Sequence, residues 1–111
     1  MGFTKIAFPS LAWVEGGNRL ERKKADPGRG ATLLEFAPGF ADPNWCERSH
    51  VLFVVSGVLD IELEAPAARV ERLSVGECAW LDRGTRHRVR NPGREPVTLF
   101  IVSDVRYEPT A

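Results

Sequence analysis

Histidine and cysteine, the side chains best suited to metal binding or acid–base chemistry, are scarce in this 111-residue chain. There are two histidines, His50 and His87, and two cysteines, Cys46 and Cys78. Imidazole titrates near neutral pH and binds metals, and a thiolate is both a nucleophile and a soft metal ligand. Which of the four could act together depends on the elements that carry them.

His87 lies in the stretch 76–91, G-E-C-A-W-L-D-R-G-T-R-H-R-V-R-N, which predicts a strand at 78–81, a tight turn at 82–84 and a second strand at 87–91. Successive side chains point to opposite faces of a strand. Arg86, Arg88 and Arg90 therefore share one face, which we expect to meet solvent or acidic neighbours because unpaired guanidiniums are hard to bury. His87 is then directed inward.

The rest of the chain predicts an all-β sandwich or barrel, since short strands alternate with glycine and proline turns and no segment carries a sustained helical period. In residues 58–64, apolar Leu59, Ile61 and Leu63 alternate with acidic residues, as in a half-buried strand. The N-terminal part is expected to form a short strand and an apolar arm, followed by a surface hairpin whose charged run at 21–24 is a solvated edge. Further strands are predicted at 32–36, 50–55, 69–73 and 97–103.

The composition indicates one globular domain spanning residues 1–111. Hydrophobic residues make up 43% and charged residues 27%, and Lys plus Arg equals Asp plus Glu at 15 each. This balance gives no reason to expect a nucleic-acid partner or an anionic membrane. No apolar run suits export or could span a bilayer, so we expect a cytoplasmic protein with free thiols.

The stretch 76–91 resembles the second motif of the cupin superfamily, G-x5-P-x-G-x2-H-x3-N. Gly76, Gly84, His87 and Asn91 match its spacing, and Asp82 stands where proline is usual. The first motif, G-x5-H-x-H-x3-4-E-x6-G, is matched in spacing alone and only in its later part, because Gly39 lies one residue off the usual gap for the opening glycine. Counted back from Gly57, its glutamate falls on His50 and its two histidines on Cys46 and Asn44. The resemblance implies a jelly-roll (double-stranded β-helix) barrel with a core at about 32–103 and an N-terminal strand arm at 1–30.

In that family the four polar positions usually bind one divalent metal, which implies a metal site at Cys46, His50 and His87. Two imidazoles and a thiolate suit Zn²⁺, Fe²⁺, Ni²⁺ or Cu²⁺ better than Mg²⁺ or Ca²⁺. The alternative is that the metal site is lost. His50 and His87 would then be pocket residues, able to do acid–base work on a ligand, and Cys46 a small buried thiol.

Other residues are candidates for contacting a substrate. Asparagine is a weak metal ligand, so Asn44 is expected there, with Trp45 and Trp80 able to stack on a planar ligand. Tryptophans in small β domains more often belong to the core or an interface. Cys78 is expected to be a buried core thiol, and the arginine face to pair with Asp60, Glu62 and Glu64.

Two kinds of function follow. One is a small cupin enzyme that acts on a polar metabolite by metal-assisted or acid–base chemistry. The other is a metal-free, non-catalytic small-molecule binding or sensing module. The resemblance also implies a homodimer, with the apolar arm crossing to the second copy.

Overall fold

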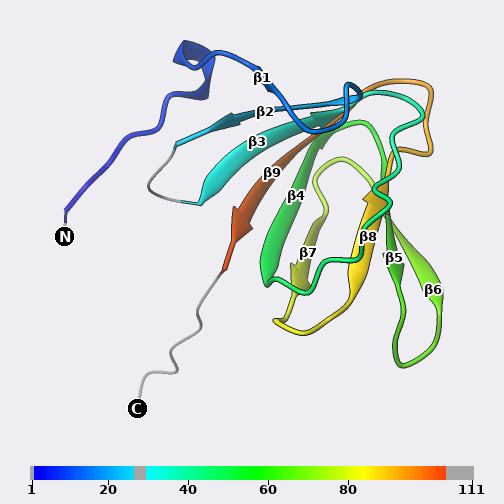
Figure 1. Cartoon of the computed structure of the whole chain (residues 1–111). Helices are drawn as coiled ribbons and strands as arrows, with labels where there is room; N and C mark the ends of the chain where they lie inside the picture. The colour runs from blue at the N-terminus through cyan, green and yellow to red at the C-terminus, as the bar shows by residue number, and fades with distance from the viewer. Residues whose placement is uncertain (1, 27–29, 105–111) are drawn as a thin grey trace.

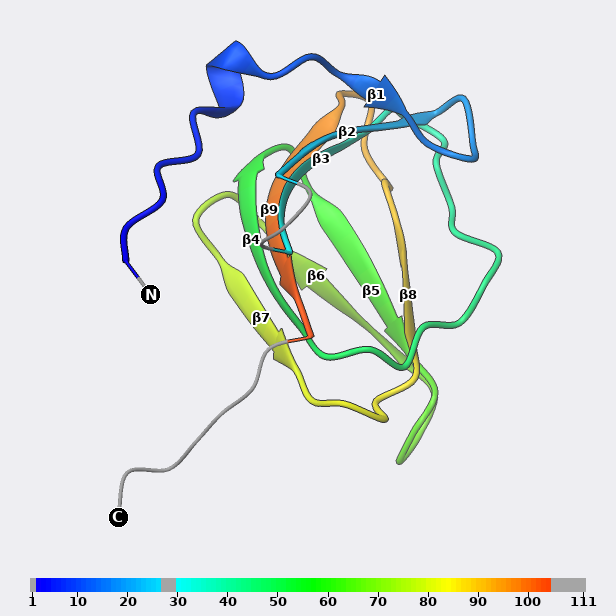
Figure 2. The same cartoon turned by 60° about the vertical axis from the view of Figure 1, so that its left-hand side comes forward.

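Two antiparallel sheets face one another in the computed structural model, which describes residues 2–26 and 30–104 (Figures 1 and 2). The six-stranded sheet has the order β1-β2-β3-β9-β4-β7, and the three-stranded sheet has the order β6-β5-β8. The strands are β1 (Val14–Glu15), β2 (Glu21–Ala25), β3 (Ala31–Phe36), β4 (His50–Ser56), β5 (Leu59–Leu63), β6 (Arg69–Leu73), β7 (Cys78–Leu81), β8 (His87–Arg90) and β9 (Val97–Ser103). This arrangement confirms the predicted jelly roll.

The strands predicted between residues 32 and 103 are all present, with no end shifted by more than one residue. The boundary between β4 and β5 is set by a turn that requires glycine. Gly57, between β4 and β5, has φ +81°, and a Cβ there would lie 2.6 Å from the backbone oxygen of Pro96. Any larger residue would have to displace that backbone.

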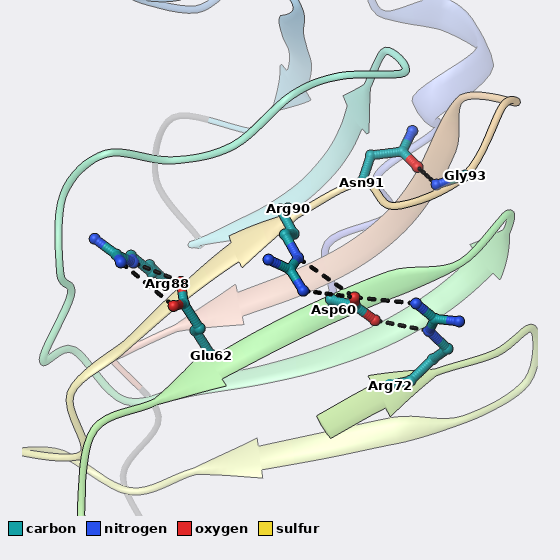
Figure 3. A network of polar contacts seen from close by, with 7 residues as sticks. All are labelled: Asp60, Glu62, Arg72, Arg88, Arg90, Asn91 and Gly93. Atoms are coloured by element: carbon teal, nitrogen blue, oxygen red, sulfur yellow. Dashed lines mark hydrogen bonds and ion pairs between the residues drawn. The ribbon is translucent and has the colours of Figure 1, made fainter. Parts of the chain in front are cut away.

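Charged residues pair across the outer face of the three-stranded sheet, as predicted (Figure 3). The antiparallel register sets Glu62 opposite Arg88 and Asp60 opposite Arg90. Arg88 Nε lies 2.6 Å from Glu62 Oε2, and Arg86 Nε lies 3.0 Å from Glu64 Oε2. With the charges facing outward, β8 turns His87 and Val89 inward.

The core lies between the two sheets and is built from alternating inward residues of facing strands. The Phe36 and Phe40 rings stack with centroids 4.1 Å apart. Asn91, which ends the second cupin-like motif, is buried and closes the turn after β8: its Nδ2 donates to the carbonyl oxygens of Phe36 and Glu95, and its Oδ1 accepts from the Gly93 N–H. The buried apolar side chains are Phe36, Phe40, Leu52, Val54, Leu59, Ile61, Leu63, Leu81, Val97 and Leu99.

The N-terminal predictions need correction. The segment before β1 forms no strand. It is extended except for one 3₁₀ turn, η1 (Phe8–Ser10). The charged run at 21–24 lies in strand β2, which forms the predicted hairpin with β1 and pairs on its other side with β3. Among the described residues, no helix has the length and hydropathy needed to cross a bilayer.

Candidate metal and ligand site

Three of the four candidate ligand positions meet inside the barrel. One ligand atom each from Cys46, His50 and His87 lies within 4.8 Å of the others. The two imidazole rings are 5.1 Å apart between centroids and nearly perpendicular, and Cys46 Sγ is 3.4 Å from His50 Nε2. Both histidines are buried, and the cysteine is half-buried.

His87 is oriented by the turn that precedes β8. Its Nδ1 lies 2.8 Å from the Thr85 carbonyl oxygen, which can only accept, so Nδ1 carries the proton. The lone pair of the neutral ring is then on Nε2, the nitrogen left to face a ligand. A metal-binding histidine is typically held in this way through its other ring nitrogen.

His50 opens β4 and faces the same cavity. Its Nδ1 is 3.0 Å from Ser103 Oγ on β9, and its Nε2 is directed at the Cys46 sulfur. Burial lowers the pKa of His50 to about 4, and the neighbouring His87 and Arg48 act in the same direction. His50 is therefore neutral at pH 7, the form that binds a metal.

Cys46 reaches the site from the irregular connection between β3 and β4. Its backbone pairs with His87 in both directions: Cys46 N–H donates to His87 O at 2.8 Å, and His87 N–H donates to Cys46 O at 3.0 Å. The connection thus runs beside β8 as an additional extended segment. The pairing brings the sulfur onto the same inward face as the His87 ring.

The three donors fit a transition metal in type, and Cys46 and His50 also fit one in spacing. A tetrahedral site with Zn–N near 2.0 Å and Zn–S near 2.3 Å separates its ligand atoms by roughly 3.3–3.8 Å. The 3.4 Å between Cys46 Sγ and His50 Nε2 lies in that range. Three protein ligands leave a fourth position for water or substrate, as in catalytic zinc sites.

The site opens into a cavity of about 310 Å³ between the sheets. Sequence reasoning missed several polar residues of its wall. Glu21 and Lys23, at alternate positions of β2, both line it, as do Asp42 and Ser103. A charged run alone does not tell which of its side chains face a cavity. Once the run is assigned to a strand, however, the alternation singles out this pair.

Glu21 has a perturbed acidity. Burial raises the pKa of its carboxyl, the nearby Asp42 carboxylate adds to this, and Lys23 acts in the opposite direction. Within residues 2–26 and 30–104 the Glu21 side chain has no ion pair or hydrogen bond. An unpaired carboxyl with a raised pKa in a cavity is a candidate for proton transfer.

The predicted substrate contacts are not gathered with Cys46, His50 and His87, which are called the trio below. Asn44 is exposed at a bend where its N–H donates to Asp42 Oδ1, and it lines an adjoining hollow that shares Glu21 and Asp42 with the cavity. Trp45 stacks on Arg88 outside the cavity, and Trp80 is 56% exposed with its indole N–H donating to Asp82. None of the three lines the cavity of the trio.

Cys78 is exposed, so its prediction as a core thiol was wrong. It lies with Trp80 on the outer face of β7, whereas Leu81 is buried. Because β7 is apolar on both faces, its sequence does not show which face is inward.

A family model for the cupin domain matches residues 32–103. The chain belongs to the cupin family. A comparison with curated proteins found no match for this cupin.

Solved structures agree on the fold. CENP-C from Drosophila melanogaster, in a crystal structure bound to CAL1, is 16% identical, with a TM-score of 0.75 over 87% of this chain and 82% of that one. The polyketide cyclase RemF from Streptomyces resistomycificus is 19% identical, with a TM-score of 0.71 over 95% and 82%. FeII HppE, known from a crystal structure, is 12% identical, with a TM-score of 0.71 over 92% and 60%. These identities are low enough that the likeness shows the fold alone.

Proposed function

We propose that this cupin binds one divalent transition metal, Zn²⁺, Fe²⁺, Ni²⁺ or Cu²⁺, through Cys46, His50 and His87 and holds a small polar metabolite beside it. The observation that carries this proposal is the convergence of three metal-capable donor atoms on one cavity. The orientation of His87 by Thr85 supports it, because it leaves Nε2 free. One structural neighbour, FeII HppE, is compatible with a transition metal in a protein of this fold.

The cavity residues suit chemistry on a ligand that carries an anionic group. When bound, the metal would supply a Lewis acid or lower the pKa of a coordinated water. Lys23, exposed and without an ion pair in the described part of the chain, is available to bind a carboxylate or phosphate. Glu21, with its raised pKa, would give a proton to such a ligand or take one from it.

A second function is favoured by one observation. Without an ion, the trio already has polar partners: Cys46 for His50, Ser103 for His50 and the Thr85 carbonyl for His87. The same cavity could therefore serve as a metal-free binding or sensing pocket.

Elemental analysis separates the two functions. We expect about one transition metal per chain in wild-type protein purified without added metal, and much less in His87→Ala. Arg69→Ala, a change at an exposed residue of β6, should keep the metal content of the wild type. Added Zn²⁺ at about 100 times its Kd should stabilise the metal-depleted wild type by about 2.7 kcal/mol and raise its Tm. Wild-type protein that holds no metal and gains no stability with Zn²⁺, Ni²⁺ or Fe²⁺ would exclude the metal function.

We also propose that this cupin is a homodimer joined through the outer face of the six-stranded sheet. That face exposes Phe53, Val55 and Trp80 on β4 and β7, each by 41% or more. The N-terminal segment lies against the same face at β9, where the Phe8 ring meets the Phe100 ring edge-on with the two centroids 6.0 Å apart. Phe3, nearer the N-terminus of the same segment, is 88% exposed and available to a second copy.

A further inference from the structure

Trp45 lies directly before Cys46 in the loop between β3 and β4. The bridge between Cys46 and His87 is antiparallel, so Trp45 falls opposite Arg88. The Arg88 guanidinium lies 4.3 Å from the centre of a Trp45 ring, and that of Arg86 lies 5.5 Å away. Trp45 therefore sits on the outer face of β8 between two cations.

Both cations are themselves held in place. Arg88 is bonded to Glu62 at 2.6 and 3.3 Å through Nε and Nη2, and Arg86 Nε lies 3.0 Å from Glu64. A guanidinium fixed by a carboxylate presents its flat face to the indole. The indole thus has a preformed place outside the barrel (Figure 3 shows the Glu62–Arg88 pair).

The loop is held beside β8 by separate backbone bonds and not by a continuous ladder: Asp42 N–H donates to Val89 O, and Cys46 pairs with His87 in both directions. Between the Ala41–Arg90 and Cys46–His87 bridges it advances five residues while β8 advances three. The two extra residues are taken up around Asn44, at the bend where its N–H meets Asp42. A slip of one residue would turn Trp45 inward and Cys46 outward, because side chains alternate in extended backbone.

We propose that Trp45 is a positioning residue: its stack on Arg88 and Arg86 reinforces the register set by the Cys46–His87 backbone pair and so helps to hold the Cys46 thiol in the cavity beside His50 and His87. The expected effect of Trp45 on metal binding rests on the proposed function, whereas its expected effect on the position of the thiol does not. Trp45 then acts on the site from outside the barrel, without touching a ligand.

Trp13 offers a matched control. It also lies between two cations, Arg22 at 4.3 Å and Lys24 at 4.9 Å, but on the β2 side of the molecule. Trp13→Ala therefore removes the same kind of stack without touching the Cys46 loop. Trp45→Phe serves as the conservative variant, since it keeps an aromatic face for Arg88.

The first readout needs no metal. In a Cys78→Ser background the remaining thiol is Cys46, and its rate of reaction with a disulfide reagent such as 5,5′-dithiobis(2-nitrobenzoate) measures how accessible its sulfur is. We expect Trp45→Ala to raise that rate about tenfold, and Trp13→Ala to leave it within about twofold of the background. Trp45→Phe should lie near the background.

The second readout is the Zn²⁺ dissociation constant, measured by competition with a chromogenic chelator. Loss of an outer group that orients a ligand typically weakens metal binding about 10- to 100-fold, which is the expectation for Trp45→Ala. If Trp45→Ala fails to fold, the double variant Arg86→Gln/Arg88→Gln removes both cations at the surface and should change both readouts in the same direction.

Equal thiol reactivity in the Trp45→Ala and Trp13→Ala proteins would overturn the positioning role. Wild-type protein that binds no Zn²⁺ while Trp45→Ala still exposes the thiol would reject the proposed metal and keep the positioning role. Wild-type protein that binds Zn²⁺ no more tightly than Trp45→Ala does would reject the positioning role and keep the metal.

Discussion

At the scale of single residues, the site depends on two histidines that are held differently. His87 is fixed by a backbone carbonyl, so its tautomer is determined by the turn before β8. His50 meets a hydroxyl and a thiol, which can each donate or accept, so its tautomer can change with what binds. His50 is therefore the more adaptable of the two ligands.

The low pKa of His50 predicts acid sensitivity of the metal-free protein. The ordinary pKa of 6.5 applies to the unfolded chain, and the folded value is about 4. Between these values the unfolded chain binds the additional proton, so the free energy of unfolding falls as the pH falls from 6.5 to 4. The His50 contribution to that loss is about 3 kcal/mol.

Urea unfolding at pH 7 and pH 4 measures this loss, with His50→Gln as the control. The variant should lose less stability between the two pH values than the wild type, because glutamine does not titrate. Equal losses in the two proteins would show that His50 is not held neutral by the fold.

At the scale of elements, the three-stranded sheet is joined on its outer face by ion pairs of unequal burial. The Asp60 side chain is only 2% exposed and lies between Arg72 and Arg90 (Figure 3). Hydrogen bonds from Arg72, with a smaller contribution from Arg90, lower the pKa of its carboxyl. The Glu62 side chain, paired with Arg88, is 34% exposed.

Burial should decide what each pair contributes to stability. Asp60→Asn weakens charge-assisted bonds that link β5 to β6 and to β8, and we expect it to cost about 1–3 kcal/mol. Glu62→Gln, its matched control on the same strand face, should cost less than about 1 kcal/mol because water screens that pair. Chemical denaturation of both variants checks the order, and a larger loss for Glu62→Gln would contradict it.

The strands show what a single sequence can predict. Alternating charges on residues 60–64 and 86–90 were enough to place the two strands with acids facing arginines, because only one face of each can be buried. The inward Glu21 and Lys23 were not predictable in the same way, because every residue from 21 to 24 is charged. Asn44 was placed by motif spacing, but the two-residue bulge carries it away from the site.

At the scale of the whole molecule, the two sheets differ in their outer surfaces. The three-stranded sheet carries the ion pairs, whereas the six-stranded sheet exposes Phe53 and Val55 beside Trp80. The N-terminal segment runs beyond the edge of the barrel in both views (Figures 1 and 2). An apolar outer sheet next to an extended segment is the basis for the proposed homodimer.

Light scattering at micromolar concentration tests this assembly. The wild-type protein should have twice the 12.3 kDa mass of the chain, and Phe53→Lys should shift it to the single-chain mass because a charge there cannot be buried between copies. Val70→Lys, at an exposed position on the outer face of the other sheet, should remain dimeric. A single-chain mass for the wild type would refute the dimer.

The central claim is that Cys46, with His50 and His87, forms one metal site. It is tested most directly by the absorption spectrum of the protein loaded with Co²⁺. We expect a thiolate-to-cobalt charge-transfer band in the wild type and in Cys78→Ser, and its loss in Cys46→Ser. A band that persists in Cys46→Ser, or one that disappears in Cys78→Ser instead, would contradict the site described here.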